Sequence, residues 1–272
     1  MKRWFASIVL AGCAAKVLAG PGLALVAGDE WIFSDPAFDG YAPEGYAGNA
    51  NQNQILLSNF FSYMTSNSLG TGKSLSLGGA NVIELGTHFA STAASFGETV
   101  DFSSAQDSAA NYNLMNYDIV SVEETYLHSE NDCRALYNYV MAGGHLFIRA
   151  GVGDQDQTTW NQFLPTFGMS MDGLTDPVYA ADVTITGGLN SIVNGASSYT
   201  WSLGNPIEVT GPEAQLAVIG THPIGLMGSF VDNPNIATPF RFVPASTPEP
   251  STILALGVMV GPMLVRRRKR QK

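Results

Sequence analysis

The sequence predicts an α/β protein in which helices cover both faces of a mostly parallel sheet. Short apolar runs alternate with segments whose apolar residues recur at helical spacing, and this alternation is typical of successive βαβ units. The runs contain few polar residues, as expected for strands that are buried on both faces. After Gly168 the pattern changes to short strands between turn-rich loops, which we expect to complete the sheet or to cover one of its edges.

The individual elements are expected in the following order. Asp29–Asp35 has the composition of a short strand, Asn51–Met64 that of an amphipathic helix, and Ser66–Gly79 that of a Gly- and Ser-rich linker. Further strands are expected over Ala80–Leu85, Glu98–Phe102, Asp118–Val122, His145–Ala150, Val183–Thr186, Tyr199–Ser202 and Gln215–Ile219. Further helices are expected over Thr87–Phe96, Ser129–Ala142 and Thr158–Phe167, and a spacer rich in Pro, Asn and Gly over Thr221–Ser246.

The N-terminus has the pattern of a secretory signal peptide. Two basic residues precede a stretch from Trp4 to Gly28 that is apolar apart from Lys16, and small residues ahead of Asp29 allow signal peptidase to cleave just before it. Leu10–Cys13 also matches a bacterial lipobox, which would make Cys13 a lipidated N-terminus. The short apolar segment before this motif and the second apolar stretch after it favour ordinary cleavage.

The last 25 residues have three parts. Pro248, Glu249 and Pro250 precede the apolar run Ile253–Val265, and a basic cluster that begins with Arg266, Arg267 and Arg268 ends the chain. As a helix this run of 13 residues would be about 20 Å long, shorter than the ~30 Å hydrocarbon core of a bilayer. We therefore expect a transient insertion in the inner membrane, with the basic end in the cytoplasm.

This tripartite tail resembles the PEP-CTERM sorting signal of Gram-negative bacteria. The resemblance implies that an exosortase, a membrane protease or transpeptidase, recognises and processes the tail, and that the protein ends at the cell surface or outside the cell. The expected organisation is a signal peptide over residues 1–28, an α/β domain over 29–225, an extended spacer over 226–247 and the sorting signal over 248–272.

Three motifs in the central region are similar to known sequences. They are Gly28–Trp31, Tyr139–Gly144 within the longer run up to Ile148, and Trp160–Gly168. Together with Tyr117–Val120 they resemble the flavodoxin-like, class I glutamine-amidotransferase-like domains of secreted bacterial proteins, and a group of PEP-CTERM proteins with the same three motifs. The resemblance covers roughly residues 28–225 and implies no established activity.

The nucleophile of a glutamine amidotransferase is absent from the expected positions. That cysteine follows a strand on a tight turn, whereas the predicted strands here are followed by Glu123–Thr125 and Gly151–Asp154, and no Gly-x-Ser-x-Gly motif occurs. Cys133 falls on the apolar face of a predicted helix, as a buried structural thiol does. We therefore expect a non-catalytic protein with a structural or glycan-binding role in exopolysaccharide.

Charge excludes one class of partner. Between Asp29 and Thr247 the sequence has 22 acidic and four basic residues, so no basic patch is available to displace the counterions of nucleic acid. An acidic surface suits neutral glycans or divalent cations.

Acidic residues after two predicted strands leave an alternative open. Glu123 and Glu124 follow one strand and Asp154 and Asp156 follow another, at the sheet edge where open α/β folds bind ligands. They would serve a degenerate or unrecognised glycan-acting hydrolase, although adjacent glutamates on a strand point to opposite faces. Asp154 and Asp156 are weak candidates for a Ca²⁺ site, because the remaining ligands of an EF-hand are missing. No metal-ligand spacing links His88, His128, His145 and His222, and no other cofactor is expected.

Overall fold

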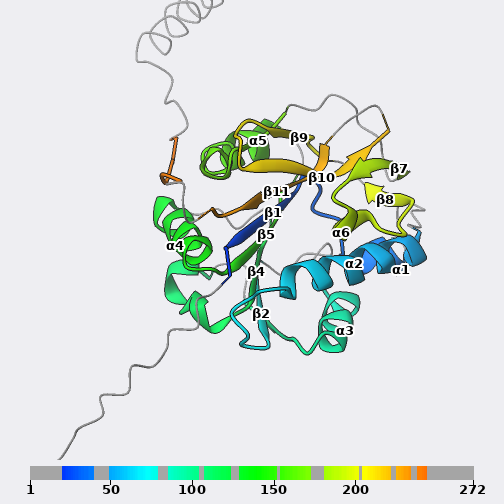
Figure 1. Cartoon of the computed structure of the whole chain (residues 1–272), viewed down its shortest axis with the longest axis horizontal. Helices are drawn as coiled ribbons and strands as arrows, with labels where there is room; N and C mark the ends of the chain where they lie inside the picture. Colours follow the sequence, from blue (N-terminus) through cyan, green and yellow to red (C-terminus); the bar gives the residue numbers. More distant parts are fainter. Residues whose placement is uncertain are drawn as a thin grey trace, which may run out of the picture.

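A large β-sheet runs through the centre of the molecule (Figure 1). The computed structural model describes residues 20–39, 49–78, 85–103, 107–123, 129–151, 154–172, 181–201, 204–221, 225–233 and 238–243. Within these ranges the sheet has nine strands in the order β3-β2-β4-β5-β1-β11-β10-β7-β8.

The sheet has a parallel and an antiparallel half. Parallel neighbours are β3 (Thr99–Phe102), β2 (Lys73–Leu77), β4 (Ile119–Val122), β5 (His145–Arg149) and β1 (Leu23–Ala27). In the antiparallel half, β11 (Gly225–Val231) pairs with β1 and β10 (Ala214–Gly220) pairs with β11. Next to β10 comes β7 (Ala181–Gly188), and β8 (Ser198–Trp201) pairs with β7 at the edge. A separate pair is formed by β6 (Met169–Met171) and β9 (Ile207–Val209). Of the strands after Gly168, β7, β8, β10 and β11 therefore extend the sheet, as one of the two predicted arrangements required, and β6 and β9 do not.

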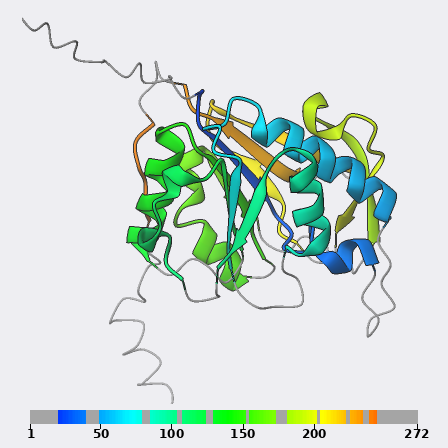
Figure 2. The same cartoon turned by 90° about the horizontal axis from the view of Figure 1, so that it is seen from below.

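Helices cover both faces of the sheet, which confirms the predicted α/β architecture (Figure 2). One face carries α1 (Asp35–Asp39), α2 (Ala50–Thr65), α3 (Thr87–Ser95) and α6 (Asn190–Val193). The other face carries α4 (Glu130–Met141), α5 (Asp154–Trp160) and the 3₁₀ turns η2 (Ala109–Asn111), η3 (Leu114–Asn116) and η5 (Leu164–Phe167).

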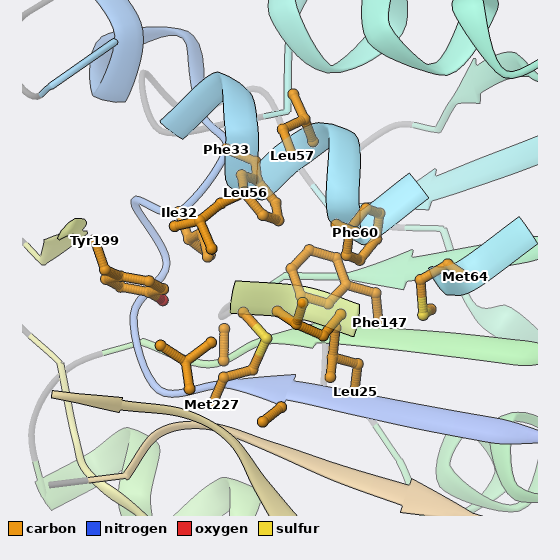
Figure 3. Packing of buried hydrophobic residues seen from close by; sticks show 14 of the residues in the cluster. Leu25, Ile32, Phe33, Leu56, Leu57, Phe60, Met64, Phe147, Tyr199 and Met227 are labelled. Carbon is orange, nitrogen blue, oxygen red and sulfur yellow. The ribbon is translucent and has the colours of Figure 1, made fainter. Parts of the chain in front are cut away.

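Side chains alternate between two cores, one on each face. On the α2 side Leu25 of β1, Phe147 of β5 and Phe60 of α2 meet, with 4.6 Å between the two ring centroids (Figure 3). On the α4 side Val26 and Ile148 pack with Leu136 of α4. Strands buried on both sides explain the nearly continuous apolar runs of the sequence.

The predicted helices over α2, α3 and α4 are confirmed, as are the strands over β3, β4, β5, β7, β8 and β10. Three local predictions are wrong. The helix expected over Thr158–Phe167 is instead the end of α5, a turn over residues 161–163 and the 3₁₀ turn η5. Asp29–Asp35 is a series of turns rather than a strand, with Phe33 at φ 63°. The supposed linker Ser66–Gly79 contains β2, whose Ser74 and Ser76 are buried. The strand expected over Ala80–Leu85 lies outside the described residues except for Leu85.

The first strand lies inside the stretch assigned to the signal peptide. β1 is hydrogen-bonded to β5 on one side and to β11 on the other, and none of its residues is more than 4% exposed. The folded domain therefore includes residues before Asp29. Composition alone does not separate a short buried strand from the apolar core of a leader.

Two parts of the predicted spacer also belong to the fold. β11 occupies residues 225–231, and residues 238–243, which we call the strap, lie against α4 and η5 (Figure 1, orange). The Tyr137 hydroxyl donates to the Thr238 carbonyl over 2.5 Å, and the guanidinium carbon of Arg134 lies 4.3 Å from the centroid of the Phe240 ring. No described helix is long and apolar enough to cross a membrane. Residues 248–272, with the predicted sorting signal and apolar helix, lie outside the described residues, as does Cys13.

Candidate functional site

The carboxyl ends of β1, β2, β4 and β5 meet at one edge of the sheet, the place where open α/β folds bind ligands. The register of β4 and β5 pairs Val122 with Ile148, so the next residues, Glu123 and Arg149, lie side by side. Their side chains form an ion pair and are 7% and 1% exposed. The first candidate acid of the sequence analysis is therefore neutralised inside the protein.

Arg149 also fixes the loop that follows β1. Its Nη1 donates to the carbonyl of Glu30 at 2.7 Å and to that of Ile32 at 3.4 Å. Asp29 is fully buried, and its Oδ1 accepts the amide N–H of Trp31 at 2.8 Å. One arginine thus joins the ends of β1, β4 and β5, and the Gly28–Trp31 motif belongs to this structural connection.

Glycines let the backbone close around this ion pair. A Cβ on Gly78, at the end of β2, would lie 2.4 Å from Cγ of Glu123, and one on Gly28 would lie 2.0 Å from the carbonyl oxygen of Asn205. The backbone N–H of buried Asn205 in turn donates to the Gly28 carbonyl at 2.9 Å. Side chains larger than hydrogen at Gly28 and Gly78 would displace these contacts.

No described contact joins the other acidic candidates to Glu123. Asp154 and Asp156 fall at the start of α5, and their side chains lie outside the described part of the structure, as does Glu124. Among the described residues, no group of three or more His, Cys, Asp or Glu side chains is placed to hold a metal ion. A calcium site at Asp154 and Asp156 stays a prediction.

Cys133 is a residue of α4; its side chain faces the core and is fully buried. Burial, with a smaller contribution from the neighbouring Asp132 carboxylate, raises the pKa of its thiol to about 12. The thiol therefore stays protonated at neutral pH and is a poor nucleophile.

The two histidines in the described part of the chain, His88 and His145, act in packing. The His88 ring stacks on Phe38 with 4.5 Å between centroids, and its Nε2 lies 3.0 Å from Oδ1 of Asp39, so it joins α3 to α1. His145 is 2% exposed, and burial lowers its pKa. His128 and His222 lie outside the described residues.

A second cluster of ionisable groups lies at the opposite, amino edge of the parallel strands. Glu98 and Asp118 are 4% and 1% exposed. The Ser74 hydroxyl donates to Glu98 Oε2 at 2.9 Å, and Asp118 accepts the amides of Thr71 and Gly72 at 2.9 and 2.7 Å. Burial, together with the charge of Asp118 and a hydrogen bond to it, raises the pKa of Glu98 to about 7 against the lowering effect of Ser74. No local sequence pattern reveals this carboxyl pair, because its members are 20 residues apart.

Two surface cavities complete the set of candidate sites. One of about 590 Å³ lies at the start of α3 and is mainly apolar; its lining residues are Leu85, Gly86, Thr87, Ala90, Ser91 and Phe102. The other, of about 440 Å³, lies between the strap and the turns before β6 and β10. Hydroxyl-bearing Thr166, Thr210 and Thr238 line it together with Glu213 and Arg241. We call the second one the strap cavity.

Comparisons with known proteins give no family. No family model and no curated protein matches the chain. A solved structure described as a cold-adapted beta-galactosidase from Rahnella sp. R3 is similar over 57% of this chain, with 18% sequence identity and a TM-score of 0.36. The matched region spans 26% of that chain. A likeness this weak supports no statement about activity.

Proposed function

We propose that this chain is exported and delivered to the cell surface or the extracellular matrix by exosortase processing of a PEP-CTERM tail. In this proposal its α/β domain has a non-catalytic, structural or glycan-binding role in exopolysaccharide. The export part is supported by the tail, where Pro248-Glu249-Pro250, a short apolar run and a basic cluster follow one another.

The ion pair at the carboxyl edge carries the non-catalytic part. Strands β2–β5 follow one another across the sheet in the order of the first four strands of a flavodoxin-like fold, and β1 takes the place of the fifth. In such a sheet the ligand crevice opens where the strand order reverses, here between β2 and β4. Glu123 lies over Gly78 at this point and is held by Arg149. A buried, paired carboxylate is poorly suited to act as a general acid or base on a glycan.

Glycan binding is supported by the strap cavity. It combines three threonine hydroxyls, one carboxylate and one guanidinium with the prolines Pro165, Pro212 and Pro239. Binding sites commonly combine a few placed polar groups with apolar lining, and hydroxyl, carboxylate and guanidinium groups can pair with the hydroxyl groups of a neutral sugar. The Thr166 hydroxyl already donates to the Arg241 carbonyl, which leaves Thr210, Thr238, Glu213 and the Arg241 guanidinium for this role.

Two measurements test this role. Exopolysaccharide from the native cells in a gel should retard the purified protein, and Glu213→Ala and Arg241→Ala should weaken retardation at least about fivefold. Glu208→Gln, an exposed change on β9 outside the cavity, is the matched control. Release of reducing ends from that polysaccharide, lost in Glu123→Gln, would instead establish the hydrolase.

Delivery is tested separately by cell fractionation. The full chain with Pro248→Ala, Glu249→Ala and Pro250→Ala should stay in the inner-membrane fraction, whereas Ser246→Ala with Thr247→Ala should reach the surface or medium as the parent does. Equal release of both proteins would contradict exosortase-dependent sorting.

A further inference from the structure

Residues 20–22, which precede β1, already make close contacts with other segments. A Cβ on Gly22 would lie 1.7 Å from the carbonyl oxygen of Val140 at the end of α4, and one on Gly20 would lie 2.7 Å from Asn67 Cβ. The Gly22 carbonyl accepts the amide of Asp232 at 2.7 Å, and the Leu23 amide donates to Gly144 at 3.2 Å. Before β1 starts, the chain is thus already packed against three other segments, at Asn67, Val140 and Asp232.

β1 itself stands in the middle of the sheet. Leu23 pairs with His145 of β5 on one side and with Val231 of β11 on the other, and this double pairing continues through Ala27. Figure 3 shows Leu25 among Phe147, Met64 and Met227 in the core. Strands β5 and β11 would both become open edges if β1 were missing.

Cleavage just before Asp29 would therefore destroy the domain that it releases. The side chains of β1 are buried in both cores, and losing this buried apolar area removes a large part of the small net stability of a domain. An exported protein of this fold must retain residues from at least Leu23 onward.

The sequence upstream of β1 contains the basic, apolar and small-residue parts of a signal peptide, so β1 is not needed for export. Two basic residues are followed by the apolar stretch Trp4–Ala15, 12 residues long, within the usual 7–15 residues of a signal-peptide core. Lys16 ends this stretch, and Val17 and Ala19 then place small side chains at the third and first positions before a peptide bond. Before the lipobox cysteine Cys13, the apolar core would be shorter.

We propose that signal peptidase cleaves between Ala19 and Gly20, so that the mature protein begins at Gly20 with β1 intact. This inference rests on the proposed export. It divides the apolar stretch Trp4–Gly28 into a leader that is removed and a strand that is paired on both sides within the sheet. The cleavage bond then lies directly before Gly20, whose backbone lies against Asn67.

Peptide mapping of the N-terminus tests the site with the full chain expressed in a Gram-negative host. The exported protein should begin at Gly20. Ala19→Tyr, which puts a bulky side chain before the bond, should reduce processed protein at least about tenfold, while Ala14→Leu within the leader core should leave processing unchanged.

The possible failures are distinguishable. An exported, folded protein that begins at Asp29, or at a lipidated Cys13, would overturn the cleavage site but leave export standing. A protein that keeps Met1 and remains inside the cell would overturn both the site and the proposed export.

Discussion

At the residue scale, the Glu123–Arg149 pair controls the carboxyl edge of the sheet. Both side chains are almost fully buried, and a buried charge that loses its partner costs far more than an exposed one. Arg149 additionally supports the turn after β1 through two carbonyl groups. We therefore attribute the geometry of the Gly28–Trp31 motif to this arginine.

Replacing Arg149 should be strongly destabilising. Arg149→Met leaves Glu123 buried and unpaired, so the free energy of unfolding from urea titration should fall by about 3–5 kcal/mol. Arg149→Met with Glu123→Gln should recover part of that loss. The exposed pair of Glu130 and Arg134 is the control: Glu130→Gln should cost less than about 1 kcal/mol. A similar small cost for both changes would contradict a buried pair.

Glu98 should make stability fall as pH rises. Its pKa is raised from 4.5 to about 7 in the folded protein, so between these values the folded state binds more protons than the unfolded chain. The stability present at low pH is thus lost as pH rises toward 7. As pH rises from about 4 to 8, the free energy of unfolding should fall in the parent and in Glu98→Gln. The fall should be about 2–3 kcal/mol smaller in the variant.

The nearby ionisable groups are common to both proteins in this comparison. Asp118, Tyr139 and His145 lie in the same buried cluster, and the lowered pKa of His145 acts in the opposite direction, with stability lost as pH falls. Identical pH profiles for the parent and Glu98→Gln would show that Glu98 ionises normally.

At the element scale, β1 is expected to be essential. A chain from Gly20 to Thr247 should unfold in one cooperative transition, whereas a chain from Asp29 to Thr247 should lack near-UV circular dichroism and bind a dye for exposed apolar surface. Native-like dichroism in the shorter chain would show that another segment replaces β1 between β5 and β11.

The strap is expected to open separately from the core. Val243 donates its amide to Gln162 at 3.0 Å, and Arg241 to Thr166 Oγ1 at 3.0 Å. Phe240→Ala removes the ring that packs on Tyr137 and Arg134, so these two amides should exchange faster with solvent while the thermal midpoint changes little. Val243→Ala, at a side chain that is 56% exposed, is the control. Unchanged exchange in Phe240→Ala would refute packing by that ring.

Sequence patterns predicted the elements whose side chains repeat. Helices α2 and α4 have clear apolar periods, and β4 and β5 are continuous apolar runs. The ion pair could also have been anticipated, because Arg149 is a charged residue at the end of an apolar run and neighbouring parallel strands bring it beside Glu123.

Strands β1, β2 and β11 were not predicted because their composition is typical of other kinds of segment. β1 has the composition of a leader. β2 contains two serines, which made it look like part of a Gly- and Ser-rich linker. β11 contains Gly225 and Gly228, which read as turn residues. In the fold a Cβ at Gly225 would lie 2.1 Å from the Ile207 carbonyl oxygen, and one at Gly228 2.5 Å from Met169 Sδ. These glycines let β6 and β9 approach β11, a tertiary contact that local sequence does not reveal.

At the scale of the whole molecule, the domain is tied closely to its tail. The strap ends at Val243, and only residues 244–247 separate it from Pro248. Five backbone steps reach at most about 17 Å. In the proposed export route, the face formed by α4, η5 and the strap would therefore stay near the membrane until the tail is cut.

The most direct measurement of the central claim is the intact mass of the protein from native cells and medium, with and without the exosortase of that cell. We predict loss of the tail in the region of Pro248 only when the exosortase is present. A mass that includes every residue up to Lys272 in both samples would contradict processing, and the protein would then be a tail-anchored envelope protein.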